Sequence, residues 1–120
     1  GSRPAGEARR MLREAKSLAR RMRRRRLPYA IGWSQLIDAA VNVQRGRIET
    51  AVEELRAAAD GFDAQSMGMH ATAARWRLGE LLGGDAGAAL VEEARLDLSG
   101  RSIERPERMI VVLAPGFDRR

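Results

Sequence analysis

Two pairs of adjacent carboxylates are the first groups in this sequence that could act together as an acid and a base. They are Glu53-Glu54 and Glu92-Glu93, and both lie in segments with helical periodicity. Adjacent residues of a helix point about 100° apart, so the carboxylates of one pair do not converge on a substrate. We interpret them as charges of solvated helix faces, paired with Arg56 and Arg95.

The single histidine, His70, and the glycine-rich run Gly83-Gly84-Asp85-Ala86-Gly87 are the remaining candidates for chemistry. A catalytic triad around His70 would need Ser34 or Ser66, and neither lies in a nucleophile-elbow sequence. The glycine run follows a helical segment and lacks the Lys-Ser/Thr pair of a phosphate-binding loop, so we interpret it as a helix connection. We therefore predict no catalytic, cofactor-binding or metal-binding residues, and we expect His70 on a helix packing surface.

A run of arginines is the strongest local signal. Six occur within seven residues: Arg20, Arg21, Arg23, Arg24, Arg25 and Arg26. Such a run could neutralise nucleic-acid phosphates, or it could face an acidic protein or a membrane surface. No aromatic residue interleaves for base stacking, and cations at the end of a helix also complement the helix dipole. We therefore prefer a solvated face and keep the run as a candidate basic interaction patch.

The residues that position these groups repeat at helical spacing along most of the chain. β-Branched and aromatic residues are sparse, which argues against strands. The predicted inward faces are Ala8, Met11, Leu12, Ala15, Leu18, Ala19 and Met22; Tyr29, Trp33, Leu36, Ile37, Ala40, Val41 and Gln44; Ile48, Ala51, Val52, Leu55, Ala59 and Phe62; Ala71, Ala74, Leu78 and Leu81 or Leu82; and Leu90, Val91, Ala94 and Leu98. With a short last helix from Glu107 to Leu113, about six helices are predicted.

Proline and glycine mark the ends of these segments. Leu27-Pro28 ends the first and starts the second, Gly46 closes the second as a left-handed C-cap, and Pro106 opens the last helix. Gly83-Gly84 forms the turn before the fifth helix, with Asp85 as its N-cap. Connections of two to five residues predict antiparallel neighbours.

The two middle helix pairs resemble each other. Residues 51–56 (Ala-Val-Glu-Glu-Leu-Arg) recur 39 residues later as residues 90–95 (Leu-Val-Glu-Glu-Ala-Arg). Each copy follows a glycine turn and a helix with one tryptophan, Trp33 or Trp76, which we interpret as core anchors and not as ligand platforms. A repeat of helix pairs near this length is typical of TPR proteins and related α-solenoids.

Composition limits the class of protein. Of 120 residues, 44% are hydrophobic and 32% charged, which fits one globular domain over residues 3–120; Gly1-Ser2 is interpreted as a cloning scar. No run reaches the ~18 apolar residues of a spanning helix, so we expect no membrane span. The chain has no cysteine, which excludes disulfides and thiolate metal sites and fits a cytoplasmic location.

The last third of the chain has a recognisable order of motifs. Arg75-Trp76-Arg77-Leu78-Gly79-Glu80-Leu81-Leu82-Gly83-Gly84-Asp85 is followed by Ala89-Leu90-Val91-Glu92-Glu93-Ala94, then by Arg105-Pro106-Glu107-Arg108-Met109 and Leu113-Ala114-Pro115-Gly116-Phe117. This order resembles the extreme C-terminal, TPR-like region of large multidomain bacterial serine/threonine protein kinases and related ATPase-containing regulators. The resemblance implies TPR-like helix pairs, with kinase or ATPase domains upstream in a parent protein. Its motifs are structural and imply no ligand.

We therefore expect an all-α fold of three TPR-like antiparallel helix pairs, a fragment of a right-handed α-solenoid whose first helix belongs to an incomplete preceding pair. The expected function is a non-catalytic protein-protein interaction or scaffolding module of a bacterial signalling protein, in the C-terminal region of a serine/threonine kinase. The alternative is a nucleic-acid-associated regulatory domain that uses the arginine-rich first helix. The expected partner is another protein or another domain of the parent chain, and a homo-oligomer stays open.

Overall fold

A computed structural model describes residues 3–24 and 30–118, and every regular element in these ranges is an α-helix. The helices are α1 (Arg3–Arg24), α2 (Ala30–Gln44), α3 (Ile48–Ala64), α4 (Gly68–Leu82), α5 (Gly84–Gly100) and α6 (Pro106–Leu113). The prediction of an all-α fold with about six helices is confirmed for this part of the chain. The predicted boundary at Leu27-Pro28 lies outside the described residues.

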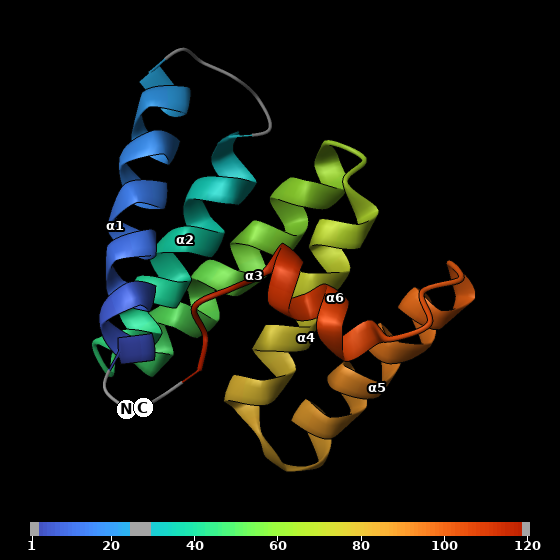
Figure 1. Cartoon of the computed structure of the whole chain (residues 1–120). Helices are drawn as coiled ribbons and strands as arrows, with labels where there is room; N and C mark the ends of the chain where they lie inside the picture. The colour runs from blue at the N-terminus through green and yellow to red at the C-terminus, as the bar shows by residue number, and fades with distance from the viewer. Residues whose placement is uncertain (1–2, 25–29, 119–120) are drawn as a thin grey trace.

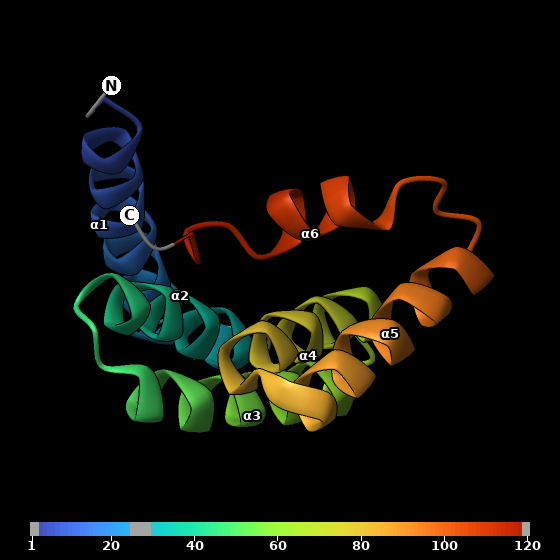
Figure 2. The same ribbon diagram turned by 90° about the horizontal axis from the view of Figure 1, so that it is seen from below.

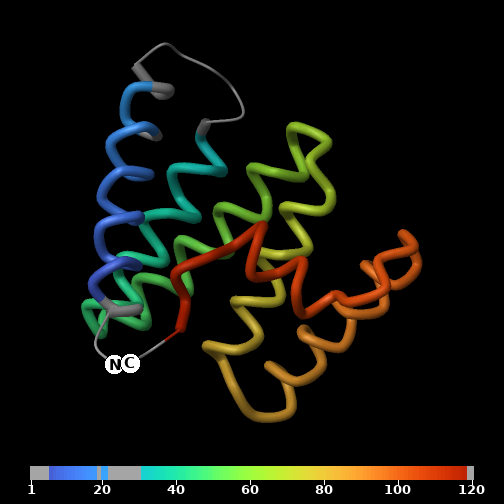
Figure 3. The backbone as a smooth tube through the Cα atoms, in the orientation of Figure 1, coloured from blue at the N-terminus to red at the C-terminus, as the bar shows by residue number. Residues whose placement is uncertain are grey.

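Helices α1 to α5 form a row in which each helix packs against the next one along the chain (Figure 1). Figure 2 shows α1 at one end of this row and α5 at the other. The short α6 does not extend the row. It packs against α4 and α5 and runs back toward α1 along one side, which we call the inner face. The tube in Figure 3 shows the chain after α6 returning to α1 and α2.

Large apolar side chains and alanines together form the core of the row. The largest fully buried side chains are Phe62, Leu36, Leu55, Leu98, Ile110 and Val43. The core also contains helical alanines that have no exposed surface: Ala39, Ala51, Ala58, Ala71, Ala73 and Ala74. Because an alanine side chain is a single methyl group, the helix backbones can approach closely at these positions. The small residues of the sequence therefore lie where the helices cross.

Two glycines, Gly79 of α4 and Gly87 of α5, allow a close approach between their helices. A Cβ atom added to Gly79 would lie 2.6 Å from the carbonyl oxygen of Gly87, and a Cβ on Gly87 would meet the carbonyl oxygen of Gly79. Real Cβ atoms do not come this close to a backbone atom. The two backbones can therefore touch only because both residues lack a side chain.

Two consecutive glycines also make the turn between α4 and α5. Gly83 and Gly84 have φ angles of +66° and +62°, a left-handed backbone that residues with a side chain rarely adopt. Because Gly83 occupies the N-cap position, α5 begins at Gly84, two residues earlier than an N-cap at Asp85 would place it. The predicted N-cap role of Asp85 is therefore wrong; this residue lies in the first turn, where its charge complements the helix dipole. Gly46, with φ +76°, follows α2.

The contact between Gly79 and Gly87 can be tested with a matched pair of substitutions. Gly6 is an exposed helical glycine of α1 with no atom near its virtual Cβ, so Gly6→Ala should gain up to ~1 kcal/mol from helix propensity. Gly87→Ala gains the same propensity but forces α4 and α5 apart, so a net loss of ~1–3 kcal/mol is expected. Urea unfolding followed by circular dichroism measures both. Equal effects of the two changes would show that the helices can separate freely.

Candidate interaction site on the inner face

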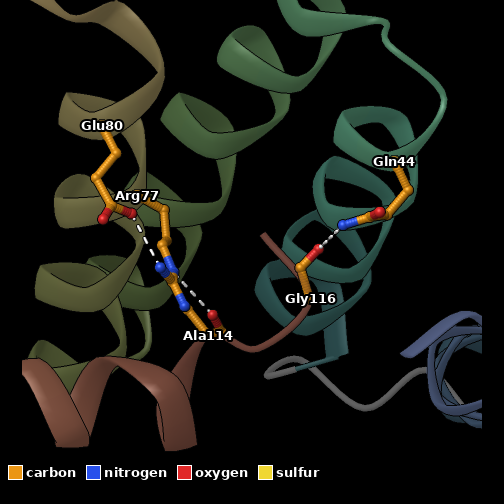
Figure 4. A network of polar contacts seen from close by, with 5 residues as sticks. All are labelled: Gln44, Arg77, Glu80, Ala114 and Gly116. Carbon is orange, nitrogen blue, oxygen red and sulfur yellow. Dashed lines mark hydrogen bonds and ion pairs between the residues drawn. The ribbon is translucent and has the colours of Figure 1, made fainter. Parts of the chain in front are cut away.

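The C-terminal part of the chain lies across the inner face as a strap, a name used here for α6 together with residues 114–118. Two of its side chains after α6, Ala114 and Phe117, are buried. The strap contacts α4 through Arg77 and α2 through Gln44, both distant from it in sequence (Figure 4). It therefore connects the middle of the helix row to the end near α1.

Arg77 is a charged residue that the packing buries, with 6% of its surface exposed. Its Nε donates a hydrogen bond to the carbonyl oxygen of Ala114 at 2.9 Å, and its Nη1 donates to Glu80 Oε1 at the same distance. The guanidinium carbon lies 5.4 Å from the centre of the Phe117 ring. A buried cation is tolerated only when hydrogen-bond acceptors and an opposite charge surround it. The strap supplies one of these acceptors.

The side chain of Gln44 binds the main chain of the strap at its other end. Its Nε2 donates to the carbonyl oxygens of Gly116 at 2.9 Å and Asp118 at 2.7 Å. Together with Ala114, which accepts from Arg77, the bound carbonyls belong to every second residue. The inner face therefore binds this segment through its backbone.

An apolar pocket of about 150 Å³ lies between α1, α2 and the strap. Its wall consists of Ala8, Met11, Leu12, Ala15, Trp33, Leu36, Ile37, Pro115 and Gly116. A Cβ on Gly116 would lie 2.9 Å from Leu12 Cδ2, and Gly116 has φ +88°. The strap can form one wall of this pocket because residue 116 has no side chain.

The rim of the pocket on α1 is apolar and open to solvent. Met11 is 60% exposed and Leu18 is 51% exposed. With Ala15 they follow one another at helical spacing on one side of α1. Leu12 is buried on the neighbouring side, where α1 packs against α2. The apolar stripe predicted for the first helix is therefore only partly covered.

Trp33 connects the pocket to an aromatic cluster. The centre of its ring lies 5.7 Å from that of His70, which lies 5.3 Å from that of Phe62. His70 is half-buried in the first turn of α4, and this burial lowers its pKa below the ordinary value of 6.5. The neutral ring thus packs between two aromatic residues, on a helix packing surface as the sequence predicts.

The two tryptophans of the repeated sequence lie in different surroundings. Trp76 is buried in α4, and the guanidinium carbon of Arg95 lies 5.0 Å from its ring centre. Arg95 also forms ion pairs with Glu92, at 3.6 Å, and with Glu107. Trp33 is only half-buried and forms part of the pocket wall.

The predicted basic patch is described in part. Arg20 and Arg21 have exposed side chains on α1, and neither belongs to the pocket wall. Outside the described side chains lie the other members, Arg23, Arg24, Arg25 and Arg26. The structure therefore shows two solvated cations on α1 and does not bring them to the apolar pocket.

The residues that hold the strap were missed in the sequence. Phe117 is a lone aromatic residue beyond the last predicted helix, and such a ring indicates a segment that returns to the core. Arg77 lies three residues after Ala74, on the side of its helix predicted to face inward. Phe117 and Arg77 were therefore the residues from which the packing of the C-terminal segment could have been predicted. Gln44 lies on the predicted face of the second helix, where an amide among apolar residues needs a hydrogen-bond partner.

Within residues 3–24 and 30–118, the His, Asp and Glu side chains form no group of three or more that could hold a metal ion. Over the same part of the chain, no helix combines the length and the apolar character needed to cross a membrane.

The role of Gln44 in holding the strap predicts a specific change in mobility. Gln44→Ala removes two hydrogen bonds to the strap, while Asn42→Ala removes only a bond to Glu54 Oε1 in α3. Each change should cost ~1 kcal/mol in the free energy of unfolding. Only Gln44→Ala should lower the ¹⁵N heteronuclear NOE of residues 116–118. Equal NOE values in the two variants would contradict backbone binding by Gln44.

Burial of His70 predicts a pH dependence of stability. Because its pKa is lowered by burial in the folded protein, the unfolded chain binds a proton more readily. The free energy of unfolding should therefore be highest above pH 6.5 and fall as the pH drops below this value. Urea unfolding at pH 7.5 and 5.5 measures the change, with His70→Gln as the control that should lose it. An NMR titration that places the His70 pKa above 6.5 would contradict the prediction.

Comparison of the chain with protein families, with curated proteins and with solved structures found no match. The function is therefore inferred from the geometry and chemistry of the inner face.

Proposed function

We propose that this chain is a non-catalytic protein-interaction module whose docking site is the open part of the inner face, between α1, α2 and the strap. In this proposal it belongs to the C-terminal region of a bacterial signalling protein, such as a serine/threonine kinase. That context rests on the sequence resemblance of the last third of the chain. The partner is another protein or another domain of the parent chain.

The proposed TPR-like character rests on the repeated helix pairs. The related sequences of residues 51–56 and 90–95 both lie in the second helix of a pair, α3 in α2–α3 and α5 in α4–α5. Trp33 and Trp76 lie in the first helix of each pair. The helices of each pair pack together, and α3 packs against α4 between the pairs. This arrangement supports a row of stacked helix pairs, an architecture that other proteins use to present binding surfaces.

The main support for a docking site at this place is the exposed apolar rim of the pocket. Met11, which lines the pocket, leaves more than half of its surface in contact with water, and so does Leu18, seven residues further along α1. Contiguous exposed apolar surface around a hollow marks interaction sites. The side chains of the pocket wall include no acid, base or nucleophile, so the site is suited to binding and not to chemistry.

The alternative of a nucleic-acid-associated domain draws on the exposed Arg20 and Arg21. These two residues would contact phosphates, and binding through them would depend strongly on salt. Helix α1 has no aromatic residue on which a base could stack. Because the apolar rim offers a specific surface and the arginines offer only charge, we prefer the interaction with a protein.

A random-peptide selection on the folded chain tests the proposed function. Peptides enriched from a displayed 16-residue library should bind the purified protein, and Met11→Glu should weaken their binding at least tenfold, because a carboxylate on the rim must be desolvated by the ligand. The dissociation constants are measured by fluorescence anisotropy with synthetic peptides.

The matched control is Val112→Glu, which places the same charge on an exposed apolar residue of α6 outside the pocket wall. This variant should bind the peptides as the unmodified protein does. Failure to enrich any peptide, or equal binding to both variants, would show that the rim is not a docking site.

A further inference from the structure

We infer that the pocket between α1, α2 and the strap is a binding site for one ring-sized apolar group, namely the anchor side chain of a partner peptide. The anchor is an aromatic or large aliphatic side chain such as Phe, Leu or Met. This inference deepens the proposed function and rests on it, because it names the chemistry that the docking site recognises.

The volume of the pocket sets the size of the group. At about 150 Å³ it is comparable to an apolar protein cavity that takes up benzene. Such a space is filled by a six-membered ring or a branched chain of four carbons, whereas a methyl group leaves most of it empty. An alanine or glycine of a ligand would therefore gain little from entering it.

The wall of the pocket sets the polarity of the group. Eight of its nine residues carry hydrocarbon or thioether side chains or an indole ring, and the ninth is Gly116. A charged or amide group that entered would lose its water, and among these side chains only the indole N–H of Trp33 is a hydrogen-bonding group. A polar group left without a partner costs ~1–3 kcal/mol or more. An apolar group meets no such penalty. The site therefore selects against polar anchors.

The position of the pocket shows how a peptide would present the group. Met11 stands at its rim, and the flexible thioether of methionine adapts to ligands of different shape. Leu18 extends the apolar surface along α1, away from the strap. On the opposite side, Pro115 and Gly116 form the wall. The pocket is thus continuous with the part of the inner face that already holds the strap through its backbone, so a peptide lying along α1 would place one side chain into it beside the strap.

Toluene is the probe that tests the pocket without any peptide. We expect saturable binding, detected as shifts of the ¹³C-labelled methyl groups of Met11, Leu36 and Ile37 and as a change in Trp33 fluorescence. Ala15→Leu fills the pocket from its wall and should weaken toluene binding at least tenfold. The matched control is Ala88→Leu, the same change at an exposed position of α5, which should leave binding unchanged. Should Ala15→Leu unfold the domain, Ala8→Leu fills the pocket from another wall residue.

The peptides selected on the inner face provide the second arm. Replacing their largest apolar residue by Ala should weaken binding at least tenfold, and Ala15→Leu should weaken binding of the parent peptide to a similar extent. If Met11→Glu abolishes peptide binding while the filled-pocket variants bind toluene and peptides normally, the pocket inference is wrong and the proposed function stands. If toluene binds and no peptide is enriched, the pocket binds apolar groups but the protein-interaction function is wrong, and with it the assignment of the anchor to a peptide.

Discussion

The guanidinium group of Arg77 is buried beneath the strap, and burial of a charge is costly unless hydrogen bonds and an opposite charge compensate for the lost water. Glu80 supplies the charge from the next turn of α4, and the carbonyl oxygen of Ala114 supplies an acceptor from the strap. The ring of Phe117 covers the guanidinium. If the strap left, Arg77 would lose its bond to Ala114 and this cover. The position of the C-terminal segment is therefore coupled to the interior of α4, which explains how a short helix and five residues stay on the inner face.

The strap in turn determines the shape of the candidate site. Pro115 and Gly116 form the wall opposite the rim of α1, and Gly116 fits against Leu12 because it has no Cβ. Gln44 fixes the carbonyl groups on either side of Phe117. The pocket therefore exists only while the strap is bound, and an interaction in α4 controls a surface formed by α1 and α2. A ligand in the pocket would stabilise the bound strap for the same reason.

The sequence predicted the helices well because their signal is local. Apolar residues three and four positions apart identify an amphipathic helix without reference to the rest of the chain, and the last helix was placed from Glu107 to Leu113 where the structure has Pro106–Leu113. The strap depends on contacts between residues 37 and 72 positions apart, for which no local pattern exists. Arg75 and Arg77 show the difference, because they lie two residues apart in the same helix. Arg75 pairs with Asp63 near the surface, whereas Arg77 is buried. Periodicity places Arg77 on the inward side of α4, but the acceptor that it binds there comes from the return of the chain.

The open pocket follows from an asymmetry between two similar helix pairs. Trp76 is covered by Arg95 of the neighbouring α5, which Glu107 of α6 holds in place, so its ring is enclosed. Trp33 instead shares a pocket with α1, whose wall residues include Ala8 and Ala15, and these two are too small to fill the space. The apolar stripe of α1 thus covers α2 at Leu12 and leaves a hollow beside Trp33. A helix stack with larger residues at positions 8 and 15 would have a second closed core and no site. Both the packing of the core and the candidate function therefore depend on small residues. In the core they let helices approach closely, and on α1 they leave room for a side chain from a partner.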